Sequence, residues 1–207
     1  MTTQEPLTAP ARGRPRDEKA RVAILDAAAE LLLARGLEKV SMDAVAEQAG
    51  ASKATIYRWW PTKEQLALEA VYRKWAAVEP EPNHTGLVRE DLVELLDSWS
   101  RLASGRPYGR VIAALLSAAQ SNPDFAQQYR DHFVEPRREQ GRKILRHAVE
   151  TGQLPTGIDV ELTLDLLYGP IYHRWLHGHA PIDEAFVRAV VDTVCAGLSA
   201  VGGAGQR

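Results

Sequence analysis

The sequence predicts an all-α protein, and three observations support this fold class. Along most of the chain, apolar residues recur at intervals of three and four, which places them on one face of a helix. Serine, threonine, asparagine or aspartate stands where many of these stretches begin, and glycine or proline stands where many of them end. The alternation of apolar and polar residues that a half-buried strand needs is not found in the sequence.

Length and composition narrow the class of protein. The chain has 207 residues, of which 45% are hydrophobic, enough for one large domain or two small ones. No apolar run approaches the roughly 20 residues that span a bilayer, and residues 1–6 do not resemble the start of a secretory signal. The single cysteine, Cys195, cannot form an internal disulfide and fits a reducing compartment. We therefore expect a cytoplasmic protein with no membrane partner.

The chain begins with two different segments. Residues 1–16 are rich in threonine, proline, alanine and arginine and have no apolar period, which predicts a disordered basic arm. From Ala20 an apolar stripe predicts a helix. Gly36 is expected to end this helix, because glycine tolerates the left-handed conformation common at helix C-termini.

Three further helices are predicted before residue 80. Each has a serine or threonine at its start, whose hydroxyl can accept a hydrogen bond from a free backbone N–H. The first two are followed by glycine and proline, which stop a helix, and the third fades before Pro80 and Pro82. The caps are Ser41, Ser52 and Thr62, and the helices cover residues 42–49, 53–59 and 63–79.

The remaining chain also has helical spacing. Pro136 interrupts a continuous pattern and is expected to begin a new helix, and Pro170 is expected to kink the helix that contains it. Residues 202–207 are expected to form a disordered tail. The predicted helices cover about residues 87–104, 107–121, 123–132, 136–151, 159–177 and 183–201.

The two short helices around Gly50 have the spacing of a helix-turn-helix. Small Ala46 lies four residues before Gly50, where the helix axes would cross closely, and Ile56 lies six residues after it, where the second helix would pack back on the first. Val45 and Ala49 complete a small core. A steep crossing leaves the second helix protruding and able to enter a major groove about 12 Å wide.

Two stretches of this region resemble the DNA-binding domain of the TetR family of bacterial regulators. They are ILDAAAELL, followed by Arg35 and Gly36, and SMDAVAEQAGASKATIYRWWPTKEQL. The resemblance is nearly continuous over about residues 20–70. It implies a three-helix DNA-binding domain over residues 17–62, a helical ligand-binding and dimerisation domain over residues 63–201, and a two-fold dimer.

The C-terminal part resembles one subgroup of the same family more loosely. The similar stretches are NPDFAQQYRDHFVEPRREQ, GQLPTGIDVELTLDLLYGPIYHRWL and PIDEAFVRAVVDTVCAGL. Ligands vary widely within such groups, so the resemblance leaves the effector open.

The resemblance makes residues 53–59 the recognition helix. Arg58 is able to bind a guanine edge or a phosphate, and the hydroxyls of Thr55 and Tyr57 are able to bind bases or phosphates. Trp59 either contacts DNA or is a half-buried aromatic, whereas Trp60 is expected to pack beneath the domain. Helix N-termini favour phosphate. The expected DNA-binding residues are Arg14, Arg16, Ser41, Lys53, Thr55, Tyr57, Arg58, Trp59 and Lys63.

The net charge of −2 does not argue against DNA binding, because the basic residues are clustered. One cluster lies in the arm, where Arg12-Gly13-Arg14-Pro15-Arg16 resembles a minor-groove-binding sequence. Narrow minor grooves attract arginine. We therefore expect the arm to contact the minor groove or to bind DNA nonspecifically. The alternative is an unstructured, generally cationic tail.

A ligand pocket needs mostly apolar walls and a few polar groups, and the aromatic residues of the C-terminal helices are able to supply both. Aromatic residues at helical spacing are more often core residues, so this assignment has a plain alternative. The candidate ligand-binding residues are Tyr72, Trp75, Trp99, Tyr108, Tyr129, Phe133, Tyr168, Tyr172 and His173.

The last two predicted helices are expected to pair across a two-fold axis as a four-helix bundle. Their apolar stripes would either form this interface or close the core of the single protomer. Cys195 lies in one stripe and is interpreted as a packing residue. The candidate interface residues are Leu162, Leu166, Val187, Val190, Val191, Val194 and Leu198.

No cofactor or metal is expected. His173 and His177 are four residues apart, but a zinc site needs further ligands and Gly178 breaks the helix. The expected partners are a double-stranded DNA operator, a second copy of the chain and an unknown small-molecule effector. The favoured function is a repressor released from a palindromic operator by that effector.

Three other functions stay open at this stage. An activator would use the same DNA-binding half. A nonspecific architectural protein would bind scrambled DNA equally well. An enzyme would use a cavity in the helical domain, but the sequence has no nucleophile elbow, phosphate loop or metalloprotease motif.

Overall fold

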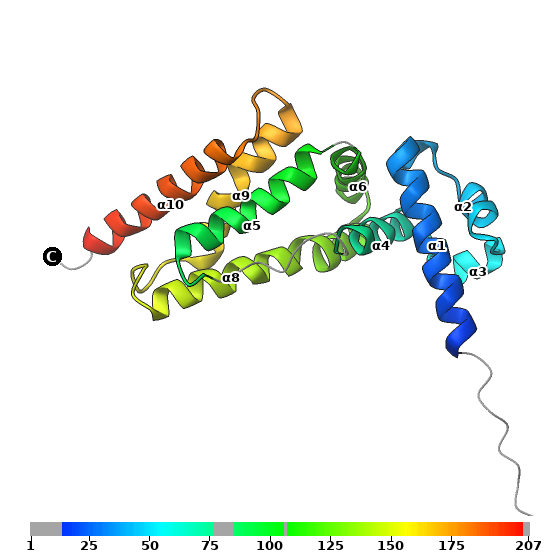
Figure 1. The fold of residues 1–207 in the computed structure, drawn as a ribbon, viewed down its shortest axis with the longest axis horizontal. Helices are drawn as coiled ribbons and strands as arrows, with labels where there is room; N and C mark the ends of the chain where they lie inside the picture. Colours follow the sequence, from blue (N-terminus) through cyan, green and yellow to red (C-terminus); the bar gives the residue numbers. More distant parts are fainter. Residues whose placement is uncertain (1–13, 77–84, 106, 205–207) are drawn as a thin grey trace, which may run out of the picture.

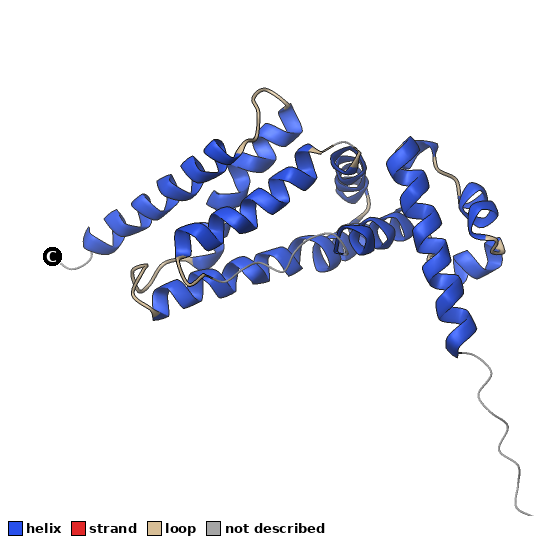
Figure 2. Ribbon diagram, in the orientation of Figure 1, coloured by secondary structure: helices blue, strands red, loops and turns tan. Residues whose placement is uncertain are grey.

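The computed structural model describes residues 14–76, 85–105 and 107–204. Within these ranges the protein consists of helices and short connections, with no strand (Figure 2). Figure 1 shows two bodies side by side: helices α1 to α3 form the smaller one, and α5 to α10 form the larger one. The prediction of an all-α fold is confirmed.

The smaller body is built from α1 (Arg14–Arg35), a 3-10 turn (Leu37–Lys39), α2 (Met42–Ala49) and α3 (Lys53–Trp59). Its core contains Ile24, Val45 and Ile56, none of which is exposed to solvent. The first helix begins at Arg14, ahead of the predicted start at Ala20, so the end of the predicted arm is helical. The rest of the arm, residues 1–13, lies outside the described residues.

Helix α4 (Lys63–Ala76) joins the two bodies, since it packs against α1 on one side and against α6, α7 and the turn that follows α7 on the other. Its start is a capping box. The Thr62 N–H donates to Gln65 Oε1 (3.2 Å), and the Gln65 N–H donates to Thr62 Oγ1 (3.3 Å). The cap at Thr62 is confirmed, and residues 77–79 of the predicted linking helix lie outside the described part.

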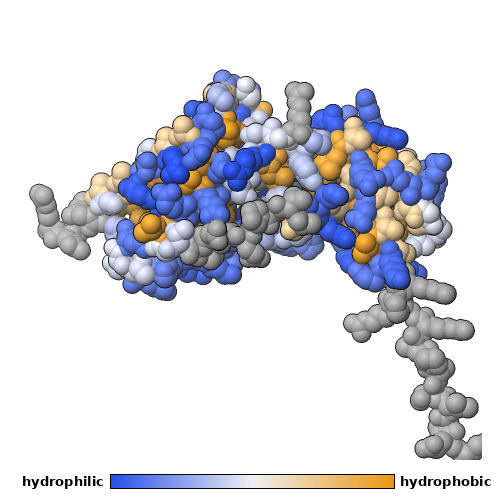
Figure 3. Space-filling view, viewed as in Figure 1, coloured by the Kyte–Doolittle hydropathy of each residue, from blue (hydrophilic) through white to orange (hydrophobic). Residues whose placement is uncertain are grey.

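The larger body contains α5, α6, α7, a π-helical turn, α8, α9 and α10. Helices α5 and α8 to α10 pack together along most of their lengths, and α6 and α7 lie beside α4 (Figure 1). Hydrophilic residues cover much of the face seen in Figure 3, and hydrophobic residues show in patches among them. The bounds are α5 (Val88–Ser104), α6 (Tyr108–Ser121), α7 (Pro123–Tyr129), the π turn (Arg130–Val134), α8 (Glu135–Glu150), α9 (Val160–His177) and α10 (Glu184–Ala204).

The expectation that a new helix begins at Pro136 is confirmed, since α8 begins at Glu135 and has Pro136 in its first turn. The boundary with the preceding helical segment is not a break, however. Helical structure runs without a break from Pro123 to Glu150, and the turn just before Pro136 is a π turn. Proline lacks an N–H, and its ring collides with the carbonyl one turn earlier in a regular α-helix. The wider π turn is a known way to insert an extra residue into a helix, and here it coincides with the proline.

Two other features of the C-terminal part concern helix continuity. Helix α9 runs through Pro170 without interruption. Leu166 is half exposed, and its carbonyl would be the partner of the N–H that proline lacks. Helix α10 continues to Ala204, past the predicted end at residue 201, so the predicted disordered tail is wrong for residues 202–204.

None of the described helices is both long and apolar enough to cross a membrane.

Candidate functional site

The turn between α2 and α3 is held by backbone hydrogen bonds. Gly50 has φ 61°, in the left-handed region. The Ala51 N–H donates to the Ala46 carbonyl (3.0 Å), and the Gly50 N–H donates to the Glu47 carbonyl (3.3 Å). This pair of bonds is a Schellman motif, which ends α2 and turns the chain sharply. The prediction that Gly50 stops the helix is confirmed.

Serine caps fix the starts of both helices. The Ala44 N–H donates to Ser41 Oγ (3.2 Å), and the Thr55 N–H donates to Ser52 Oγ (3.1 Å). The Ser52 and Thr55 hydroxyls also form a hydrogen bond (2.9 Å). Both predicted caps are therefore confirmed, and the free backbone N–H groups at each helix start are partly satisfied.

The inner side of α3 is anchored by Ile56 and by Trp60, which is only 3% exposed. The Trp60 indole N–H donates to Glu69 Oε2 on α4 (2.7 Å). Glu69 is also paired with Arg21 on α1. As predicted, Trp60 packs beneath the domain, and through Glu69 it ties α3 to both α1 and α4.

The outer side of α3 presents polar and aromatic side chains to solvent. Tyr57 is 50% exposed, Trp59 is 37% exposed, and Arg58 is exposed. The guanidinium groups of Arg21 and Arg58 lie 5.5 Å and 5.8 Å from the Trp59 ring centroid. These are cation–π distances, so the exposed indole face lies among positive charges. Contact between Trp59 and DNA stays a prediction.

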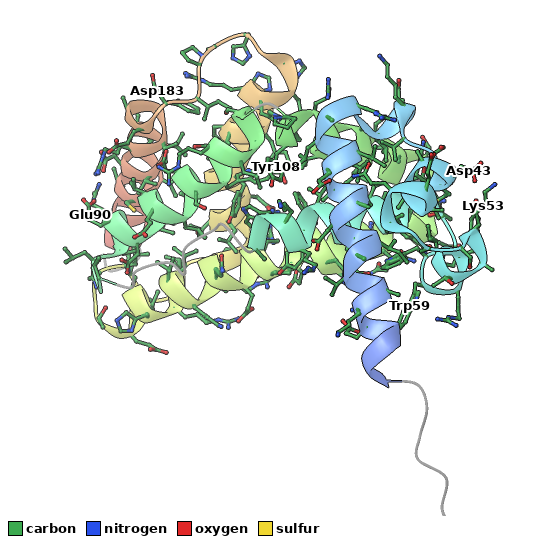
Figure 4. All side chains as sticks on the ribbon, turned by 45° about the vertical axis from the view of Figure 1, so that its right-hand side comes forward. Asp43, Lys53, Trp59, Glu90, Tyr108 and Asp183 are labelled. Carbon is green, nitrogen blue, oxygen red and sulfur yellow. The ribbon has the colours of Figure 1, made fainter. Side chains whose placement is uncertain are left out.

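The other predicted DNA-binding residues lie at or just before the starts of helices. Lys53, at the start of α3, is paired with Asp43 on α2, and both lie on the side away from the C-terminal helices (Figure 4). Ser41 is exposed and Lys63 is half-buried at the start of α4. Arg14 and Arg16 belong to the first turn of α1, and their side chains lie outside the described set. Asp43, which pairs with Lys53, and Arg21, which lies over Trp59, were not among the predicted DNA-binding residues.

A cavity of about 310 Å³ lies between α8, α9 and neighbouring segments. Three of the nine predicted ligand residues line it, namely Tyr129, Tyr168 and Tyr172. The complete lining is Leu116, Tyr129, Val134, Arg137, Arg138, Asp165, Tyr168, Gly169 and Tyr172.

The other six predicted ligand residues do not line this cavity. Trp75, Trp99 and Phe133 form a buried aromatic cluster, with ring centroids 5.8 Å apart for Trp99–Phe133 and 6.3 Å apart for Trp75–Phe133. For these three the alternative of a core role is correct, because helical spacing does not distinguish a core face from a cavity wall. Tyr72, Tyr108 and His173 also lie outside the lining.

Arg137 is the functional candidate that the sequence analysis missed. It is only 5% exposed, and its guanidinium donates to the Phe133 carbonyl. The guanidinium carbon lies 3.8 Å from the Phe133 ring centroid, 4.1 Å from that of Trp75 and 4.4 Å from that of Trp99. The available signal was its position four residues after Phe133, on the apolar face of the helix.

The cavity contains neutral hydroxyls and charged groups. Burial raises the pKa of both Tyr129 and Tyr172, so both phenols stay protonated at neutral pH. Arg138 pairs with Glu161 and Asp165 of α9, at 2.6 Å in each case. The positive charge of Arg138 is thus balanced by carboxylates.

The predicted dimer residues divide into two groups. On α9, Leu162 and Leu166 are 55% and 49% exposed. On α10, Val187, Val190 and Val191 are buried within the protomer, because that side of α10 packs against α5. The assignment of these three valines to the dimer interface is therefore corrected to the protomer core. Val194 and Leu198 are half-buried, and Cys195 is buried as expected.

The outward side of α10 has small residues, which allow another helix to approach closely. Its exposed alanine and glycine residues are Ala185, Ala189, Ala196, Gly197 and Ala200.

Near the end of α9, the rings of His173, His177 and His179 lie 4.7 to 6.5 Å apart. Among the described residues, no group of histidine, cysteine and acidic side chains has the arrangement needed to hold a metal ion.

Comparison with known proteins gives one consistent family. Residues 24–70 match the family described as "Bacterial regulatory proteins, tetR family", and residues 82–194 match "Tetracyclin repressor-like, C-terminal domain". The chain is 37% identical to the uncharacterized HTH-type transcriptional regulator YdeS of Bacillus subtilis, over 91% of this chain and 94% of that one.

Two further relatives agree. The chain is 31% identical to the DNA-binding transcriptional repressor TetR of Mycobacteroides abscessus, over 86% of this chain and 93% of that one. The crystal structure of the TetR family transcription regulator SCO0332 superposes with a TM-score of 0.76 at 37% identity, covering 86% of this chain and 98% of that one. The chain therefore belongs to the TetR family of DNA-binding transcriptional regulators and is not an enzyme.

Proposed function

We propose that this protein is a homodimeric repressor that binds a palindromic operator and leaves it when a small molecule fills the cavity of the C-terminal body. One observation supports the coupling most directly. Trp75 of α4 lies against the guanidinium of Arg137, and Arg137 lines the cavity. Since α4 also packs against α1, a ligand that displaces Arg137 would act on the helix that positions the DNA-binding body.

A second contact joins the two bodies near the start of α6. The Arg110 guanidinium of α6 donates to the Leu33 carbonyl near the end of α1, at 3.5 Å. A carbon added at Gly36 would come within 3.3 Å of the same guanidinium. A shift of α6 or α4 would therefore be transmitted to α1 by direct contact.

The DNA-binding role assigns α3 to the major groove. Arg58, Tyr57 and Thr55 are the candidates for base or phosphate contacts, and Ser41, Lys53 and Lys63 are candidates for phosphates at its border. Arg14 and Arg16, at the start of α1, are candidates for the minor groove or the backbone. DNA would compete with Asp43 for Lys53, because the lysine and the carboxylate already form an ion pair.

Dimerisation would use the exposed side of α9 and α10. Leu162, Leu166 and Leu176 supply apolar area, each about half exposed, and the small residues of α10 allow close approach of helices. Two copies related by a two-fold axis would form a four-helix bundle. Gly169 lies on this side of α9 and also lines the cavity, so the effector site would adjoin the dimer contact.

A repressor role is supported by the Mycobacteroides abscessus relative, which is a DNA-binding transcriptional repressor and is 31% identical to this chain. Its place of action would be the cytoplasm, where the chromosome of a bacterium is accessible. The experiment that tests DNA binding is selection of bound sequences from random duplexes, followed by anisotropy titrations of the selected duplex and a scrambled one.

We expect selection to yield an inverted repeat that binds at least about 10³-fold more tightly than the scrambled duplex. We also expect the affinity to fall steeply as salt rises, because phosphate contacts release counterions. Equal affinity for the two duplexes would contradict the proposal and favour a nonspecific architectural protein.

A further inference from the structure

We propose that the effector is a compact monocarboxylate with an apolar body, and that Arg137 binds its carboxylate. This inference rests on the proposed function, because it names the chemical class of the molecule that fills the cavity. It is argued from the size of the cavity, the charge of its walls and the state of its two phenols.

The volume of the cavity and its apolar walls indicate what kind of body the ligand has. A volume of about 310 Å³ is at the lower end of the range for ligand pockets, roughly 300–1,000 Å³. Leu116, Val134 and the rings of Tyr129, Tyr168 and Tyr172 present apolar surface, and Gly169 adds no side chain. Such walls favour a small hydrocarbon or aromatic body over a polar one.

The charge of the wall sets the sign of the ligand. Arg137 is buried and keeps its charge at any physiological pH. Its guanidinium packs on the rings of Trp75, Trp99 and Phe133. A cationic ligand would be repelled there, whereas a carboxylate is able to form short, charge-assisted hydrogen bonds with a guanidinium. Arg138 is a weaker candidate, since Glu161 and Asp165 already neutralise it.

The two phenols favour the same group. Tyr129 and Tyr172 both line the cavity, and burial raises the pKa of each, so each hydroxyl keeps its proton. A protonated phenol donates to a carboxylate and pays less desolvation than a second charge would. An anion held by Arg137 and a phenol would leave its apolar body to the remaining walls of the cavity, which include Leu116 and Val134.

The test compares carboxylates with uncharged analogues of the same shape. Purified full-length protein is titrated with 2-naphthoate and 2-naphthamide, and with decanoate and decanamide, by calorimetry at concentrations up to millimolar. We expect at least one carboxylate to bind at least about tenfold more tightly than its amide. The naphthyl and decyl pairs show whether the body is aromatic or aliphatic. Equal binding of each acid and amide, or no binding of either acid, would overturn the proposal.

Variants locate the binding group. Arg137→Met should remove the preference for the carboxylate, while Arg146→Met, an exposed arginine on the same helix, should leave it unchanged. If Arg137→Met does not fold, Tyr172→Phe tests the same end of the cavity and should weaken the acid more than the amide. An acid preference that survives both Arg137→Met and Tyr172→Phe would place the carboxylate elsewhere and overturn the proposal.

A DNA measurement separates this inference from the proposed function. Operator affinity is measured by anisotropy without ligand and then with the tighter-binding carboxylate. Absence of specific DNA binding without ligand defeats the proposed function, whatever the calorimetry gives. Specific DNA binding together with no acid preference defeats only the ligand class. Specific DNA binding that weakens at least about tenfold when the carboxylate is added supports both.

Discussion

At the residue scale, neighbouring side chains at the end of α3 and just after it have different roles. Trp60 is buried and donates its indole N–H to Glu69, whereas Arg58 and Tyr57 are exposed. A helix this short has few contacts of its own, so its position depends on the anchors on its inner side. Substitutions on the exposed side should therefore change the affinity for DNA, and substitutions on the buried side should change the free energy of unfolding.

Arg58→Ala should reduce operator binding and leave folding nearly unchanged. Loss of a base or phosphate contact costs about 1–3 kcal/mol of binding free energy, while an exposed arginine contributes little to stability.

Trp60→Ala should instead lower the free energy of unfolding by about 3–5 kcal/mol, because it empties a large buried site. Anisotropy and thermal unfolding separate the two effects, with Arg146→Ala as the surface control. Normal operator binding by Arg58→Ala would contradict its place on the DNA-binding surface.

Residue-level prediction succeeded where the signal was local. Ser41, Gly50 and Ser52 were identified from the sequence because capping and left-handed turns depend on residues within one turn of the helix. Arg137 was missed because its role depends on Trp75 and Trp99, which are far away in the sequence. The valines of α10 were misplaced for a related reason: a stripe predicts an apolar face but not which surface covers it.

At the element scale, the angle between α2 and α3 depends on the Schellman turn. Gly50 has a left-handed backbone, and an added Cβ would meet no heavy atom within 4 Å. Any cost of substitution there comes from backbone conformation and not from a clash. Substitutions at Gly50 therefore test the backbone conformation of the turn without disturbing the packing around it.

Gly50→Ala should lower the free energy of unfolding by about 1–2 kcal/mol, the cost of the left-handed conformation for a residue with a Cβ. Gly50→Asn should cost less, because asparagine tolerates this region. Chemical denaturation of the three proteins measures both differences. Equal stability of the alanine and asparagine variants would show that the backbone conformation at residue 50 is not what the substitution disturbs.

Helices α8 and α9 are joined by an ion-pair cluster around Glu161. Hydrogen bonds from Arg142 and Arg138 lower the pKa of Glu161 to about 2. A lowered pKa means that the stabilising effect is present above the ordinary glutamate pKa and is lost as pH falls toward the lowered value. The cluster should therefore be intact throughout the neutral range.

Glu161→Gln should lower the melting temperature at pH 7, and this difference from the unsubstituted protein should shrink as pH falls from about 5 to about 3. The matched control is Glu150→Gln on α8, an exposed residue for which no ion pair is described. Thermal unfolding across this pH range gives the result. A difference that stays constant with pH would mean that the charge of Glu161 does not contribute.

At the scale of the whole molecule, α4 connects the cavity to the DNA-binding body and α9 connects it to the proposed dimer contact. Trp75 is in contact with Arg137, and Gly169 is shared by the cavity lining and the outward side of α9.

The overall two-body arrangement was predicted from the sequence because helix punctuation and the family resemblance are both strong. The π turn before Pro136 was not, since a break and a widened turn have the same sequence signal.

The double variant Leu162→Glu and Leu166→Glu should convert the proposed dimer into a monomer of about 22.8 kDa. Both leucines are about half exposed in the single protomer, so charges there should be solvated in the monomer but opposed across a two-fold axis. Light scattering after gel filtration measures the mass, and circular dichroism checks that the fold is kept. Leu87→Glu is the matched control, because Leu87 is also exposed but lies at the start of α5, outside this surface.

The monomer should bind one half-site weakly and lose most of the affinity for the full operator, since two recognition helices one DNA turn apart bind together. A double variant that stays dimeric would place the interface elsewhere, and a monomer that keeps full operator affinity would contradict the two-fold mode of DNA binding.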